Sequence, residues 1–165
     1  MQLDVWLCLR LSRAAHIQWL RMLFRAVSRL GDGVFWYALM FLLLAADGTA
    51  AIAPVLHMVA AGLAGTILYR WLKAKTLRPR PYQVNQAISC SARPLDQFSF
   101  PSGHTLHAFA FTTIAIAYCP QLAFLLIPIA CMVALSRVVL GLHYPSDVLA
   151  GAAIGAAIAG FSLVL

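Results

Sequence analysis

The chain has 165 residues, of which 62% are hydrophobic and only 10% are charged. Soluble domains are about 45–50% apolar and about 25% charged, so this composition excludes a water-soluble globule, a disordered chain and a fibrous repeat. The 12 lysines and arginines outnumber the five acidic residues, giving a formal net charge of +7. They stand at the ends of apolar runs, which indicates membrane topology or anionic ligands and not nucleic acid.

The first 30 residues predict a basic amphipathic helix in the membrane interface. Apolar side chains recur at helical spacing, and the five arginines between them are too many for a lipid-exposed span. Gly31-Asp32-Gly33 breaks the pattern. We therefore expect an interfacial unit at residues 1–30 and a transmembrane domain at residues 31–165.

About five membrane-spanning helices are expected in the second unit, because each span needs about 20 apolar residues. The apolar runs cover residues 34–46, 49–72, 105–118, 122–139 and 148–165. The last run carries Gly151, Gly155 and Ala159 at a spacing that favours close helix packing. The expected fold is an all-α, polytopic transmembrane bundle with one substantial polar loop, at residues 73–100.

The order of the spans places all the basic residues on or near one membrane face. The amino-terminal segment, the 73–100 loop and the 140–147 turn share that face, and the 47–48 and 119–121 turns share the other. Positive charge near span ends resists translocation, so we expect this face in the cytoplasm of a bacterial inner membrane.

Three polar clusters lie on that face, each at the edge of an apolar span. They are Lys73 with Arg80-Pro81, the run Pro101-Ser102-Gly103-His104, and Ser136-Arg137 followed by His143 and Asp147. Ionisable groups at membrane depth are costly and are therefore candidates for function.

The three clusters converge on a phosphate group as their ligand. Lys73, Arg80 and Arg137 are cations, and arginine binds phosphate oxygens bidentately. Ser102 and Gly103 stand where a helix begins, and its unpaired N–H groups attract an anion. Because three cations already balance the phosphate charge, we expect neither a metal ion nor another cofactor.

The two remaining histidines fit a covalent mechanism. We assign His143 as the nucleophile that forms a phosphohistidine, with Asp147 bonded to its other ring nitrogen. We assign His104 as the acid that protonates the leaving oxygen and then activates water.

Together these clusters resemble the signature of the type 2 phosphatidic acid phosphatase superfamily, K-x6-RP, PSGH and SR-x5-H-x3-D. Every signature position is matched, from Lys73 to Asp147, and the resemblance runs from about residue 30 to the end. It implies a helical core like that of the haloperoxidases, metal-independent phosphoryl transfer and lipid phosphate substrates. Membrane members resemble six-span proteins, whereas here the arginine-rich segment replaces the first span.

The other polar residues are expected to have ordinary roles. Lys75 and Arg78 fit topological charges, Arg93 and Asp96 fit a solvated pair, and His107 fits a structural residue.

The expected function is a lipid phosphatase acting on phosphatidylglycerol phosphate, phosphatidate, a polyprenyl diphosphate or a polyprenyl-linked sugar phosphate. Three alternatives stay open: a non-catalytic protein that binds anionic lipid headgroups, a small transporter or scaffold, and a vanadate-dependent oxidase. The partners expected are the lipid substrate and membrane lipids, and nothing in the sequence indicates an oligomeric state.

Overall fold

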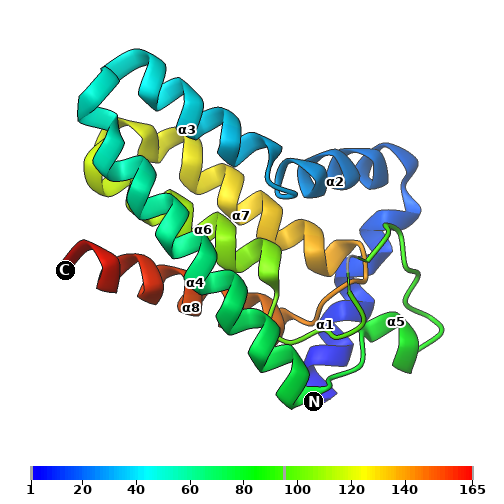
Figure 1. Cartoon of the computed structure of the whole chain (residues 1–165). Helices are drawn as coiled ribbons and strands as arrows, with labels where there is room; N and C mark the ends of the chain where they lie inside the picture. The colour runs from blue at the N-terminus through cyan, green and yellow to red at the C-terminus, as the bar shows by residue number, and fades with distance from the viewer. Residues whose placement is uncertain (1, 95, 165) are drawn as a thin grey trace.

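The computed structural model describes residues 2–94 and 96–164, and these fold into helices joined by short turns and one long loop (Figure 1). The helices are α1 (Gln2–Ser12), η1 (Arg13–His16), α2 (Gln18–Leu30), α3 (Val34–Asp47), η2 (Gly48–Ala51), α4 (Ile52–Thr76), α5 (Pro81–Val84), α6 (Gly103–Tyr118), η3 (Pro120–Leu122), α7 (Ala123–Val139) and α8 (Pro145–Val164). Within the described ranges there is no strand, which confirms the all-α prediction.

Five apolar helices correspond to the five predicted spans. Three stretches are long and apolar enough to cross a membrane: Val34–Val84, which contains α3 and α4, then Pro120–Val139 and Pro145–Val164. The fifth helix, α6, has 16 residues and lies in the middle of the bundle, where it contacts α4, α7 and α8. The span predicted to end at Leu165 is described as far as Val164.

Glycines allow α6 and α8 to approach closely. A Cβ atom added at Gly151 would lie 2.6 Å from the carbonyl oxygen of Ser102, and one added at Gly155 would overlap the carbonyl group of Leu106. Ala159, one turn further on, is fully buried. The predicted small-residue contact is therefore the α6–α8 interface, and it fixes the start of α6 against the start of α8.

The amino-terminal segment differs from the single helix expected there. It forms α1 and α2, which are separated by the short helix η1 and by an extended backbone at Ile17. The break lets both helices bury one face: α1 contacts α7 and α8, and α2 packs on α7 through Phe24 and Ser28. The opposite side of α2 leaves Trp19 and Met22 exposed, as an amphipathic helix does.

One end of the bundle carries the polar segments (Figure 1). α1, α2, α5, the long loop and the turn from α7 to α8 lie at this end, whereas η2, η3 and the end of α8 lie at the other. The three signature clusters therefore meet at one end, as the order of the spans predicts.

Candidate active site

A cavity of about 800 Å³ opens at the polar end of the bundle. Six of the eight residues assigned from the sequence line it: Lys73, Arg80, Gly103, His104, Arg137 and His143. They come from α4, the start of α5, the start of α6, the end of α7 and the turn before α8. The fold thus brings together residues that lie up to 70 positions apart in the chain.

His143 is completely buried except where it meets the cavity. Its Nδ1 donates a hydrogen bond of 2.6 Å to the carbonyl oxygen of Ser99. A carbonyl only accepts, so the proton sits on Nδ1 and the lone pair of Nε2 is left for the cavity. Burial, together with the nearby charges of Arg137 and Arg80, holds the pKa of His143 well below its ordinary value. The imidazole is therefore neutral and can act as a nucleophile.

Arg80 lies beside the nucleophilic nitrogen. One of its Nη atoms, Nη1, donates to the carbonyl oxygen of Leu142 at 2.8 Å and lies 3.4 Å from Nε2 of His143. Pro81 occupies the first position of α5, where its fixed φ favours the start of a helix. The start of α5 thereby holds the guanidinium next to His143.

Asp147 lies within ion-pair distance of His143 but makes no hydrogen bond to it, which differs from the bond expected from the sequence. The carboxylate Oδ2 lies 3.8 Å from Nδ1 of His143, beyond hydrogen-bond distance, and the Ser99 carbonyl takes that position. Asp147 instead accepts the backbone N–H of Tyr144 at 2.9 Å. Because α8 begins only at Pro145, His143 lies before the helix, so the spacing of four does not bring the two side chains together.

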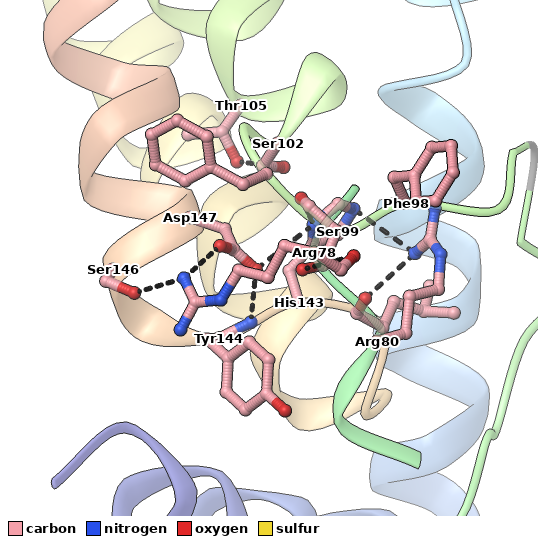
Figure 2. Close-up of polar contacts among 12 residues, drawn as sticks. Arg78, Arg80, Phe98, Ser99, Ser102, Thr105, His143, Tyr144, Ser146 and Asp147 are labelled. Atoms are coloured by element: carbon pink, nitrogen blue, oxygen red, sulfur yellow. Dashed lines mark hydrogen bonds and ion pairs between the residues drawn. The ribbon is translucent and has the colours of Figure 1, made fainter. Parts of the chain in front are cut away.

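The partner of Asp147 is Arg78, which the sequence suggested to be a topological charge (Figure 2). Arg78 Nη1 donates to Asp147 at 2.6 Å and to the hydroxyl of Ser146 at 2.8 Å, and Nη2 donates to Asp4 of α1 at 2.9 Å. Asp147 is fully buried, so this guanidinium balances its charge. The network also ties α1 to the turn that carries His143.

Asp96 forms ion pairs with two of the three cations that were assigned to phosphate binding. Its carboxylate accepts from Nζ of Lys73 at 2.7 Å and from Nη2 of Arg80 at 2.7 Å. Burial opposes ionisation, but the hydrogen bonds and charges of these two partners prevail and hold the pKa of Asp96 below its ordinary value. The solvated pair with Arg93 was therefore a wrong expectation, because Asp96 belongs to the cavity wall.

Arg137 enters the cavity from the last turn of α7. It is almost completely buried, and its Nη1 donates to the hydroxyl of Ser28 on α2. Its Nε has no hydrogen-bond partner in the part of the chain that the structure describes. A buried guanidinium with unused donors is suited to an anionic ligand.

Two of the four residues of the PSGH segment, Pro101 to His104, line the cavity. Gly103 and His104 line the cavity, whereas Ser102 is fully buried and its hydroxyl pairs with that of Thr105 at 2.9 Å. Nε2 of His104 bonds to the carboxylate of Asp32, in the turn between α2 and α3. His107, expected to be structural, also lines the cavity, and its Nδ1 lies 2.9 Å from the carbonyl oxygen of Gly103.

Sequence reasoning missed Arg78, Asp96 and Asp32. The only signal for Asp32 was a carboxylate between two glycines next to an apolar span, which resembles an ordinary helix break. Among the described residues, no three His, Cys, Asp or Glu side chains are grouped so that they could hold a metal ion. The cavity gathers the three assigned cations and three histidines, and this set is suited to phosphoryl transfer.

The comparisons with known proteins agree with this chemistry. The chain is 37% identical over 89 residues to a decaprenylphosphoryl-5-phosphoribose phosphatase of Mycobacterium tuberculosis, a match that covers 53% of this chain and 47% of that protein. It is 35% identical over 94 residues to a lipid A 1-phosphatase of Rhizobium johnstonii, covering 54% of this chain and 38% of that protein. The matches thus span about half or less of the length of these curated relatives.

Two solved structures share the fold. The crystal structure of LpxE from Aquifex aeolicus superposes with a TM-score of 0.79 at 27% identity, covering 95% of this chain and 93% of that one. A PAP2-type phosphatidylglycerolphosphate phosphatase from Bacillus subtilis superposes with a TM-score of 0.70 at 23% identity, covering 95% and 83%. Residues 50–165 match the PAP2 superfamily, and the chain therefore belongs to this superfamily.

Proposed function

We propose that this chain is an integral membrane lipid phosphatase that transfers the phosphoryl group of a lipid phosphate to His143 and then to water. The observation that carries the proposal is the position of Nε2 of His143, which faces a cation-lined cavity, 3.4 Å from Nη1 of Arg80. Lys73, Arg80 and Arg137 stabilise the transferring group, and His104 exchanges protons with the leaving oxygen and with water.

The walls of the cavity support a lipid as the substrate. Beside the charged residues, Trp36, Met40, Met58 and Leu63 from α3 and α4 line the same space. These helices belong to the stretch that is long and apolar enough to cross a membrane, so a hydrocarbon chain can lie against them while its phosphate reaches His143. The candidate substrates are lipid A phosphates, polyprenyl-linked phosphates and diphosphates, phosphatidylglycerol phosphate and phosphatidate.

The proposed location is a bacterial inner membrane with the cavity on the cytoplasmic face. Nine basic residues besides Lys73, Arg80 and Arg137 lie on the polar face: Arg10, Arg13, Arg21, Arg25, Arg29, Arg70, Lys75, Arg78 and Arg93. In this arrangement residues 1–30 lie in the interface and pack against the transmembrane domain of residues 31–165. The exposed Trp19, Met22 and Leu23 of α2 then enter the lipid, and its arginines face the headgroups.

The test is phosphate release by the purified protein in detergent, measured with and without EDTA on a panel of these lipids. We expect turnover of at least one lipid phosphate, unchanged by EDTA, because the cations of the chain replace a metal ion. A protein that binds the lipids without releasing phosphate would instead be the non-catalytic headgroup binder. Activity lost in EDTA and restored by magnesium would contradict the metal-independent mechanism.

A further inference from the structure

The turn between α2 and α3 places the carboxylate of Asp32 in contact with His104. Asp32 stands between Gly31 and Gly33, and its backbone N–H closes the turn on the carbonyl oxygen of Arg29 at 3.0 Å. A Cβ atom at Gly31 would lie 2.9 Å from Cγ1 of Val133 and 3.3 Å from Cδ2 of His104, so a larger residue would have to displace these side chains. Gly33 has a φ of 113°, which favours glycine as well.

The contact is made between an ionised carboxylate and one defined ring nitrogen. Asp32 bonds to Nε2 of His104, and this hydrogen bond is the main reason why the pKa of Asp32 lies below its ordinary value. The carboxylate is 42% exposed and lines the cavity, so it stays charged while the reaction proceeds beside it.

We infer that Asp32 is a positioning residue, which orients the His104 imidazole and stabilises its protonated form during proton transfer. The inference rests on the proposed function, since it assigns a role within that reaction. Because Asp32 occupies Nε2, Nδ1 is the ring nitrogen left to exchange a proton with the reacting oxygen.

The two half-reactions then balance. In the first, the lone pair of His143 Nε2 forms a bond to phosphorus, the bond from phosphorus to the leaving oxygen breaks, and that oxygen takes the proton of His104. In the second, neutral His104 removes a proton from water, the water oxygen bonds to phosphorus, and the electron pair of the P–N bond returns to His143. Asp32 remains ionised throughout, and its charge favours the imidazolium that the first step consumes and the second step regenerates.

A merely structural role for Asp32 would be to fasten the turn to α6. The two roles predict different effects of an Asp32 substitution on substrates with different leaving groups. An alkoxide needs a proton when it departs, and a nitrophenolate does not. The quantity to compare is kcat/KM. It reports the steps up to the release of the alcohol, so hydrolysis of the phosphoenzyme does not affect it.

The experiment measures kcat/KM of wild type and Asp32→Asn in detergent with an alkyl phosphate and with 4-nitrophenyl phosphate. On the alkyl phosphate we expect Asp32→Asn to lower kcat/KM about 100-fold, which is the lower end of the range for general acid catalysis. On 4-nitrophenyl phosphate we expect a loss of less than about fivefold, because the acid is then not needed. In a His104→Gln background, Asp32→Asn should cause no further loss of kcat/KM.

Asp47→Asn is the matched control, since Asp47 is an exposed carboxylate at the other end of α3, and it should match wild type on both substrates. Equal losses on both substrates, or no loss on either, would overturn the role of Asp32 in an active enzyme. A wild-type protein that hydrolyses neither substrate nor any lipid phosphate would instead overturn the proposed function itself.

Discussion

Arg78 balances the buried charge of Asp147 and links it to Asp4 of α1. Replacing Arg78 by Gln leaves the carboxylate fully buried with its counter-ion removed. Breaking such a pair is strongly destabilising, and because Arg78 is 22% exposed we expect a loss of about 1–3 kcal/mol in the free energy of unfolding. The measurement is thermal unfolding in detergent.

Lys75→Gln is the control for this change, because Lys75 is exposed three positions away. It should leave the unfolding temperature unchanged. If both variants unfold at the wild-type temperature, the contact of Arg78 with Asp147 does not stabilise the fold.

In the proposed mechanism, Asp96 competes with the substrate phosphate for Lys73 and Arg80. A phosphate that binds both cations must first displace the carboxylate, which accepts hydrogen bonds from each of them. Asp96→Asn removes the negative charge and keeps the size, so we expect KM for the lipid phosphate and the inhibition constant of inorganic phosphate to fall several-fold. A rise in both constants would mean that Asp96 holds the two cations in place for the phosphate.

At the scale of the helices, the contact between α6 and α8 aligns His104 with the turn that carries His143. Gly155→Ala puts a Cβ atom into the backbone of α6 at Leu106, so a helix must move. Overpacking of this kind costs about 1–3 kcal/mol, which thermal unfolding in detergent detects. Gly160→Ala, on the same helix, meets nothing within 4 Å and should be neutral. Equal stability of the two variants would contradict the close packing.

The helices and the main site residues could be predicted because their signals are local. Apolar runs mark the spans, and the spacings of Lys73 to Arg80 and of Arg137 to His143 place cations and imidazoles at span ends. The partners of these groups could not be predicted in this way. Asp32, Asp96 and Asp4 reach the site only through the arrangement of the helices, and each alone resembles a solvated carboxylate.

The expected bond between His143 and Asp147 shows how a local rule can fail. Side chains four residues apart meet when both lie on one helix, but His143 precedes the start of α8 at Pro145. Asp147 bonds to the N–H group of Tyr144 instead, as an acidic residue in the first turn does in a capping box.

At the scale of the whole molecule, the orientation in the membrane can be tested at Cys90. This residue is exposed in the long loop at the polar end. With Cys8, Cys119 and Cys131 replaced, we expect a membrane-impermeant maleimide to label Cys90 only after the cells are lysed. As a control, Asp47→Cys on a chain without other cysteines should be labelled in intact cells, because η2 lies at the opposite end. Labelling of Cys90 in intact cells would place the cavity outside.

The central claim is that His143 carries the phosphoryl group, and trapping of the covalent intermediate tests it most directly. Wild-type protein quenched during turnover of a radiolabelled lipid phosphate should hold acid-labile, alkali-stable phosphate on His143. His143→Asn should hold none and should lose about 10⁴–10⁶-fold in rate, as expected when an activated nucleophile is removed. Phosphate trapped on another residue, or activity of the variant within tenfold of wild type, would contradict the account.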